Sequence, residues 1–205
     1  MLQAVNLGCV RGDRRLFGGA NFSLTPGGLV QVTGPNGSGK TSLLRIMGGL
    51  LDPAEGEIRW GGANIRSLGE EYFTHVTYLG HRHGVKDEFS ALENLRISNA
   101  LNGIEITEEA ARLILIKMGL AGRERLPSRL LSEGQRRRVA LARLVVCKTT
   151  LWLLDEVMTS LDKAAIGLVR SLIEEHLSGG GMAMVATHQE LELSAASFQR
   201  LELAT

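Results

Sequence analysis

The feature that most constrains this chain is an apolar run that leads directly into a glycine-rich loop. Residues 29–33 read LVQVT, and GPNGSGKT (residues 34–41) and the amphipathic segment SLLRIMGGL follow at once. The apolar run predicts a buried strand, and the amphipathic spacing predicts a helix. A strand, a glycine loop and a helix in this order indicate an α/β fold, with the loop at the carboxyl end of the strand.

The glycine loop matches the pattern G-x-x-x-x-G-K-[ST] at every fixed position. Glycines let backbone N–H groups turn toward an anion, and the N-terminus of the following helix adds a favourable dipole. We expect the loop to hold the β-phosphate of a nucleotide, with Lys40 neutralising phosphate charge and the Thr41 hydroxyl binding Mg²⁺. The alternative, a turn without a ligand, is disfavoured by the complete match. The candidate nucleotide-binding residues are Gly34, Pro35, Asn36, Gly37, Ser38, Gly39, Lys40 and Thr41.

Two acidic residues end a second apolar run. LWLLDE, residues 151–156, places Asp155 and Glu156 at the end of a predicted core strand, which is where α/β proteins bind ligands. We expect Asp155 to contact Mg²⁺, directly or through water, and Glu156 to act as the general base that polarises an attacking water. An acidic pair that only faces solvent is the alternative, and the nearby phosphate loop disfavours it.

The remaining chain alternates between strand and helix patterns around a helical insert. DPAEGEIRWGGANI has the turn residues of a hairpin, and ALENLRISNALNG and TEEAARLILIKMGL have helical spacing, each ended by glycine. A long helix over LSEGQRRRVALARLVVC, the strands LWLLDE and MAMVATH, and a helix over KAAIGLVRSLIEEHL follow. This order predicts a mainly parallel sheet with a separate helical lobe.

A phosphate loop alone is shared by small-molecule kinases, GTPases and helicases, and LLSEGQRRRVALARL at residues 130–144 distinguishes among them. It resembles the LSGGQ signature of ATP-binding cassette (ABC) ATPases, and Glu occupies the tolerated middle position. The resemblance implies that this helix start meets the γ-phosphate of ATP held by the other subunit of a head-to-tail homodimer. The candidate signature residues are Ser132, Glu133, Gly134 and Gln135.

Other segments resemble the same family in the expected order. TSLD resembles the D-loop that contacts the partner subunit, through Ser160 and Asp162. His188, in MVATHQ, matches the switch histidine that contacts the γ-phosphate, so the resemblance implies a catalytic role beside Glu156. His81 stands at the Q-loop position, where most of the family has glutamine.

The resemblance covers nearly the whole chain and implies a single ABC ATPase domain over residues 1–205. Its expected fold is that of a P-loop, RecA-like NTPase, with a mainly parallel sheet, an antiparallel β subdomain and an inserted helical subdomain. We expect the nucleotide-binding core with the β subdomain at 1–87 and 136–205, and the helical subdomain at 88–135. The implied activity is hydrolysis of ATP with Mg²⁺.

Three positions depart from the family pattern. Val157 stands where proline usually follows the acidic pair, which changes the stiffness of the loop. No aromatic residue that could stack on adenine occurs near residues 10–12; Arg11 is at about that place, and Phe17 lies further on. His81 is the third departure.

Within the family, the run LGH..G.K.E..ALENL and LW.LDE resemble the heme-exporter ATPases of the cytochrome c maturation system. This implies a peripheral subunit on the cytoplasmic side of a bacterial inner membrane, paired with integral permease and heme-handling subunits. Heme itself is not expected to bind this subunit. The ATPase of another ABC transporter, or a soluble ABC ATPase outside transport, is the alternative.

Composition limits other functions. The net charge is +1, so no global field favours nucleic acid, and Arg136–Arg138 fan around a helix, with one arginine expected to turn inward. No apolar stretch approaches the roughly 20 residues of a membrane helix. Cys9 and Cys147 form no CxxC motif, and His81 and His83 lack the three or four convergent ligands that zinc requires.

Overall fold

The computed structural model divides into two compact units. Unit 1 comprises residues 1–80, 149–156 and 173–205, and unit 2 comprises residues 81–148 and 157–172. The predicted helical subdomain, 88–135, lies within unit 2, which also takes in the helix that follows it. The functional boundaries at 87/88 and 135/136 stay a prediction. The described residues are 1–80, 84–188, 191 and 193–203.

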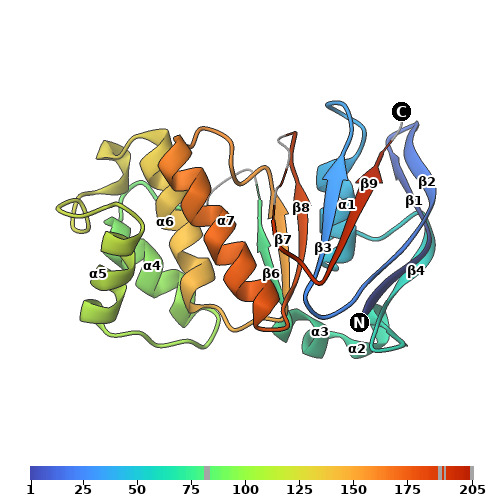
Figure 1. The fold of residues 1–205 in the computed structure, drawn as a ribbon, viewed down its shortest axis with the longest axis horizontal. Helices are drawn as coiled ribbons and strands as arrows, with labels where there is room; N and C mark the ends of the chain where they lie inside the picture. The colour runs from blue at the N-terminus through green and yellow to red at the C-terminus, as the bar shows by residue number, and fades with distance from the viewer. Residues whose placement is uncertain (81–83, 189–190, 192, 204–205) are drawn as a thin grey trace. The chain divides into compact units, whose positions relative to one another are not determined.

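A parallel sheet is the centre of unit 1, as predicted (Figure 1). Its order is β6-β7-β8-β3-β9, and each neighbouring pair runs parallel. All residues of β7 and β8 are buried, which is why both strands are continuous apolar runs. The strands are β3 (Gly28–Thr33), β6 (Val76–Leu79), β7 (Leu151–Asp155), β8 (Met182–Ala186) and β9 (Ser197–Glu202).

A second, antiparallel sheet in unit 1 has the order β2-β1-β4-β5. It confirms the antiparallel subdomain and the hairpin of β4 and β5. β1, β2 and β9 were not evident from the sequence, because glycines and register shifts interrupt the alternation of β1 and β2 and because β9 is mostly exposed. The strands are β1 (Leu2–Arg11), β2 (Arg14–Leu24), β4 (Glu55–Trp60) and β5 (Ala63–Asn64).

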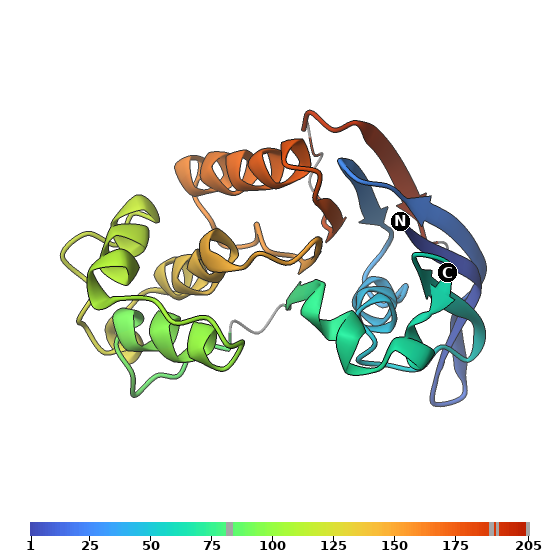
Figure 2. The same ribbon diagram turned by 90° about the horizontal axis from the view of Figure 1, so that it is seen from below.

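Helix α1 (Lys40–Met47) packs in the core that the two sheets share. Leu43, Leu44, Ile46 and Met47 are fully buried among side chains of both sheets, and Figure 2 shows the helix almost end-on. Burial of each such side chain contributes about 1.5–3 kcal/mol. The helix that carries the phosphate loop is therefore held by the core itself. The short helices α2 (Ile65–Leu68) and α3 (Glu70–Thr74) follow β5.

Unit 2 consists of helices whose starts are capped by their own sequence. Ser90 forms a capping box with Glu93, and Thr107 accepts a hydrogen bond from the backbone of Ala110. α4 and α5 pack on α6. The helices are α4 (Ala91–Ala100), α5 (Glu108–Lys117), the 3₁₀ turn η1 (Ser128–Leu130) and α6 (Glu133–Val146), together with the first part of α7 (Lys163–Ser178).

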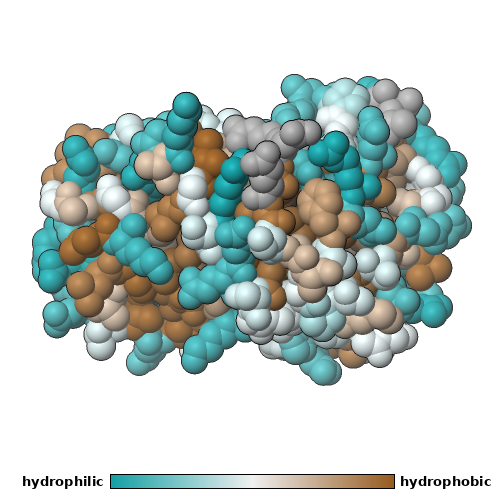
Figure 3. Space-filling model, in the orientation of Figure 1, coloured by the Kyte–Doolittle hydropathy of each residue, from teal (hydrophilic) through white to brown (hydrophobic). Residues whose placement is uncertain are grey.

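The surface of unit 2 carries several exposed apolar side chains. Leu101 is 83% exposed, Leu130 65% and Leu113 54%, and brown apolar groups gather over this helical part in Figure 3. None of the helices in the described ranges is both long and apolar enough to cross a bilayer.

Candidate functional site

The phosphate loop of unit 1 has a shape that only glycine permits at key positions. Gly34, Gly37 and Gly39 have φ values of +142°, +81° and +103°. A Cβ on Gly34 would lie 2.6 Å from the carbonyl oxygen of Leu203, so a side chain there would clash with backbone. The loop therefore exposes backbone in the way the motif predicted.

The interior of this loop holds a cation and a buried hydroxyl. Lys40 is 6% exposed, and its Nζ donates to the carbonyl oxygens of Gly34 (2.8 Å) and Pro35 (3.1 Å). Ser38 is fully buried, and its Oγ has no hydrogen-bond partner among the described residues. Because a buried polar atom without a partner is costly, the Ser38 hydroxyl suits an anion that enters the loop, and the Lys40 ammonium supplies a positive charge for it.

The register of the parallel sheet brings the other candidate residues to the same edge. Val32 of β3 pairs with Ala186 of β8, and Ala186 pairs with Asp155 of β7. The phosphate loop, His188 and Glu156 begin one or two residues after these three aligned positions. The structure thus places residues that were predicted from separate motifs side by side, at the ends of neighbouring strands.

Asp155 is a buried carboxylate that is only partly satisfied. It is 1% exposed; its Oδ2 accepts a hydrogen bond of 3.3 Å from the Tyr78 hydroxyl, and its Oδ1 has no partner among the described residues. Burial raises the pKa of Tyr78 and the Asp155 carboxylate raises it further, while a hydrogen bond with Arg45 lowers it. A free carboxylate oxygen and the Thr41 hydroxyl are oxygen donors of the kind Mg²⁺ prefers, so these residues fit that ion.

Glu156, His188 and Asn36 form a connected group. His188 Nε2 lies 3.1 Å from Asn36 Oδ1 and 3.5 Å from Glu156 Oε1. Glu156 has φ +53°, unusual for a residue with a side chain, and its N–H donates to the carbonyl of Ala186 at 2.9 Å. Since both neighbours are acceptors, a proton on Nε2 would orient the carboxylate. Nothing in the motif predicted the role of Asn36, which fills a variable position.

The signature and D-loop residues lie together in unit 2. Ser132 caps α6: its Oγ accepts from the Gln135 N–H at 3.2 Å, and its own N–H donates to Gln135 Oε1 at 2.9 Å. A Cβ on Gly134 would lie 3.0 Å from the Ser160 carbonyl oxygen. Glu133 begins the helix. A cavity of about 350 Å³ is lined by signature and D-loop residues, with Ser132, Gly134, Gln135, Ser160 and Asp162 among them.

The three arginines after the signature are used inside unit 2. Arg137 is 1% exposed, which confirms that one arginine turns inward. Arg136 pairs with Asp87 at 3.0 Å, and Arg138 pairs with Asp162 at 2.6 Å. Asp162 also accepts from the Ala165 N–H at 2.8 Å, so it caps α7 as well.

The structure describes some of the positions that depart from the family pattern and leaves His81 outside the described residues. Val157 is fully buried, so an apolar contact replaces the expected proline. Phe17 is 8% exposed and packs against Gly39, while Arg11 is exposed. His81 and His83 lie outside the described residues. Within the described ranges, no group of three or more His, Cys, Asp or Glu residues could hold a metal.

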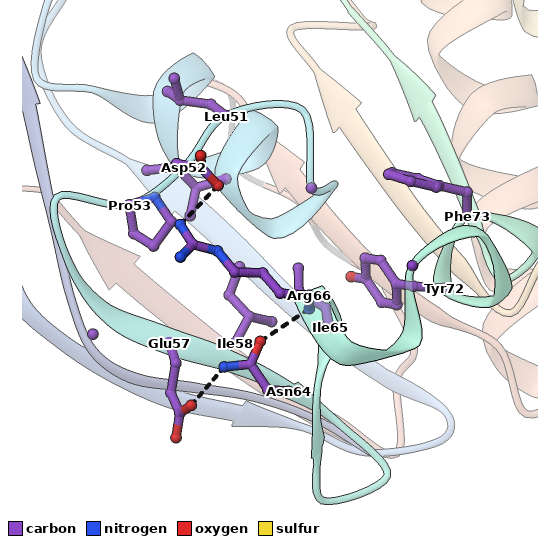
Figure 4. Close-up of a pocket in the computed structure, with 14 residues that line it drawn as sticks. Leu51, Asp52, Pro53, Glu57, Ile58, Asn64, Ile65, Arg66, Tyr72 and Phe73 are labelled. Atoms are coloured by element: carbon purple, nitrogen blue, oxygen red, sulfur yellow. Dashed lines mark hydrogen bonds and ion pairs between the residues drawn. The ribbon is translucent and has the colours of Figure 1, made fainter.

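A pocket of about 480 Å³ in unit 1 lies at the other end of α1 (Figure 4). Eight helical residues, about 12 Å, separate the two ends of this helix. The polar groups of the pocket already pair with one another: Asn64 donates to Glu57 at 2.6 Å, and Arg66 pairs with Asp52 at 2.8 Å. This pocket is therefore distinct from the phosphate loop.

Comparison with known proteins assigns the family. Residues 17–159 match the model described as ABC transporter. A "Cytochrome c biogenesis ATP-binding export protein CcmA" of Nitrosospira multiformis is 60% identical, over 98% of this chain and 98% of that protein.

Solved structures agree on the fold. A putative ABC transporter ATP-binding protein from Pyrococcus furiosus has a TM-score of 0.83 at 24% identity, over 98% of this chain and 96% of that one. The dimeric post-hydrolysis state of the ATP-binding cassette MJ0796, bound to ADP and Pi, has a TM-score of 0.79 at 23% sequence identity. The match covers 92% of this chain and 88% of that one. The fold is thus that of a nucleotide-binding P-loop ATPase, and the chain belongs to the ABC transporter family and, within it, to the CcmA proteins.

Proposed function

We propose that this chain is the ATP-hydrolysing subunit of a membrane ABC complex that exports or handles heme in c-type cytochrome biogenesis. The observation that carries the proposal is the single sheet edge from which the phosphate loop, Glu156 and His188 emerge. The close similarity to a cytochrome c biogenesis export protein over nearly the full chain supports the choice of system.

The loop of residues 34–41 binds the phosphates of ATP through backbone N–H groups, the Lys40 ammonium and the N-terminus of α1. The buried Lys40 and the Ser38 hydroxyl, which has no partner in the described part of the chain, support this role. Thr41 and Asp155 would hold Mg²⁺, and the Oδ1 of Asp155, to which no described residue donates a hydrogen bond, supports that assignment. When bound, the ion neutralises charge on the β- and γ-phosphates.

Glu156 is the general base for hydrolysis. Its carboxylate accepts a proton from a water whose oxygen bonds to the γ-phosphorus, while the bond from that phosphorus to the β,γ-bridging oxygen breaks and ADP leaves. His188 donates from Nε2 and keeps the carboxylate oriented until it turns to the γ-phosphate. The 3.5 Å separation from Glu156 supports this link.

Signature residues Ser132, Glu133, Gly134 and Gln135 bind the γ-phosphate of ATP held by a second copy of the chain. Ser160 and Asp162 of the D-loop contact that copy. A head-to-tail homodimer is supported by the dimeric cassette among the similar structures and by the shared cavity of signature and D-loop residues. Closure on ATP and opening after hydrolysis drive the membrane partners.

The chain binds peripherally to integral permease and heme-handling subunits, on the cytoplasmic side of a bacterial inner membrane. Exposed Leu101, Leu113 and Leu130 give unit 2 apolar surface for such partners. The position of His81 in the sequence supports a role in passing ATP occupancy to them. Heme stays with the membrane subunits, and nucleic acid has no part in the cycle.

The decisive experiment on the chemistry is Glu156→Gln, which keeps size and hydrogen bonding but removes the base. We expect ATP affinity close to that of the wild type and turnover reduced by about 100-fold or more. ATP titration and phosphate release measure the two quantities. Near-normal hydrolysis would refute the assignment of the base.

The choice of complex is tested by affinity purification from membranes. We expect integral subunits that carry heme to copurify with the tagged chain. Recovery of ribosomes in place of membrane proteins would overturn the transport assignment while leaving the ATPase assignment intact.

A further inference from the structure

Asn94 of α4 is a buried asparagine whose side chain joins two separate segments of unit 2. It is 7% exposed. Its Oδ1 accepts from the Lys86 N–H at 2.7 Å. Its Nδ2, which has two hydrogens to donate, lies within hydrogen-bonding distance of the carbonyl oxygens of Lys86 (2.9 Å), Phe89 (3.2 Å) and Ser90 (3.0 Å). The same Nδ2 lies 3.0 Å from the Ser128 Oγ. The amide therefore has both its acceptor and its donors engaged.

Backbone bonds complete the connection between residues 86–90 and η1. The Ser128 N–H donates to the Phe89 carbonyl at 2.8 Å, and the Arg129 N–H donates to the Asp87 carbonyl at 3.1 Å. Ser128 is fully buried. The segment is thus tied to η1 along its length and has little freedom to move separately from it.

η1 leads directly into the signature. The Leu131 N–H donates to the Ser128 carbonyl at 3.1 Å, and Ser132 then caps α6. Arg136, one turn into α6, reaches back to Asp87 at 3.0 Å. Residues 86–90 are consequently fastened to the signature on two sides, through η1 before it and through Arg136 after it.

We propose that Asn94 is a positioning residue for the signature, and that it makes residues 86–90 and the start of α6 move as one body. Residues 86–90 follow the Q-loop position in sequence. A displacement of residues 86–90 is therefore passed on to Ser132 and Gly134 of the signature. The inference rests on the proposed function, in which these residues bind the ATP of a second copy.

Asn99 supplies a matched control in the same helix. It is 2% exposed, and its Nδ2 donates to the Leu95 carbonyl at 2.8 Å, within α4 itself. Replacing either asparagine by alanine removes a buried amide from α4. Among the side-chain hydrogen bonds of the described residues, that of Asn94 reaches η1 and that of Asn99 stays within α4. A difference between the two variants therefore isolates the connection from general destabilisation.

The experiment uses the full chain carrying Glu156→Gln, which traps the ATP-bound dimer, and adds Asn94→Ala or Asn99→Ala. For Asn94→Ala we expect ATP affinity of the monomer within about twofold of the parent. Dimer formation with ATP, measured by sedimentation, should weaken about tenfold, in the usual range of coupling between sites. Asn99→Ala should dimerise like the parent. In chains that keep Glu156, kcat should fall in Asn94→Ala and stay close to the wild-type value in Asn99→Ala.

Equal dimerisation of Asn94→Ala and the parent would overturn the proposal, as would equal losses in the two alanine variants. If Asn94→Ala does not fold, Ser128→Ala removes one partner of the amide and should show a smaller loss in the same direction; no loss there would also overturn it. A parent that binds ATP and stays monomeric would instead refute the proposed dimer mechanism itself.

Discussion

The starts of α1 in unit 1 and α6 in unit 2 are both assigned to phosphate groups, and they are built in opposite ways. α1 begins after Gly39, which is in the left-handed region, and no described side chain caps it. α6 begins with a capping box in which Ser132 and Gln135 satisfy each other's backbone N–H groups.

This difference predicts how each site meets a ligand. The N–H groups of the uncapped α1 start can receive phosphate without breaking a contact in the protein. At α6, a phosphate must compete with a side-chain cap that is typically worth about 1 kcal/mol. We therefore expect unit 1 to determine the ATP affinity of a single subunit, and unit 2 to determine closure of the dimer and turnover.

The strongest test of unit 1 is Lys40→Ala. Lys40 is 6% exposed, and its ammonium group is the cation that we assign to the phosphates. Its removal should weaken ATP binding about tenfold or more and abolish hydrolysis, because the phosphates lose this positive charge. ATP titration and phosphate release measure both effects. Lys117→Ala, at an exposed site on α5, is the control and should match the wild type. Retained affinity in Lys40→Ala would contradict the role given to unit 1.

The matching test of unit 2 is Gly134→Ala. The new Cβ would lie 3.0 Å from the Ser160 carbonyl oxygen, so the D-loop must shift. Hydrolysis should fall about tenfold or more, while ATP affinity of the single subunit stays unchanged. A parallel fall in monomer affinity would remove the distinction between the two units.

Mixing the Lys40→Ala and Gly134→Ala proteins sharpens the comparison. In a head-to-tail dimer, a mixed pair regains one site with an intact loop and an intact signature. Random pairing should restore up to about a quarter of the wild-type rate if the sites act independently. No recovery in a mixture that forms dimers would argue against a composite site.

The ion pair of Arg138 and Asp162 gives a smaller effect. Asp162→Asn keeps an oxygen that can cap α7 but removes the charge. Because Asp162 is 63% exposed, a double-mutant cycle with Arg138→Met should give a coupling energy of only about 0.2–1 kcal/mol in urea unfolding. Coupling well above that range would mean that unit 2 depends on this contact for its fold.

The smallest expected effect is a pH dependence in unit 1. His176 stacks on Trp152 with ring centroids 3.9 Å apart, and burial lowers its pKa, partly offset by hydrogen bonds to the backbone of Met182 and Thr150. The neutral ring is therefore favoured in the folded state. Its contribution to stability is present above the ordinary pKa of 6.5 and is lost as the pH falls below that value toward the lowered pKa.

Melting temperatures from pH 7.5 to 5.5 should show a shallower slope in His176→Phe, which keeps an aromatic ring and cannot be protonated. His75→Phe is a matched control, since His75 stacks on Trp60. An equal slope in His176→Phe and the wild type would exclude this contribution.

Much of the fold was predictable because its signals are local. Buried parallel strands read as apolar runs in LVQVT, LWLL and MAMVA, and helices α4 and α5 end near glycine. β9 was not predictable, since its first four residues are exposed and it pairs with β3, which is far away in the sequence. The hairpin of β1 and β2 was not predicted because glycines and register shifts interrupt the alternation of its strands.

The sequence by itself determined the phosphate loop, the acidic pair, the signature and hence the family, because each is a contiguous set of residues whose chemistry requires that order. Only the tertiary structure decided that Asn36 meets His188 from 152 residues away, that one Asp155 oxygen has no partner among the described residues, and that Asn94 joins η1. These contacts arise from strand register and helix packing, which depend on burial of apolar surface across the whole chain.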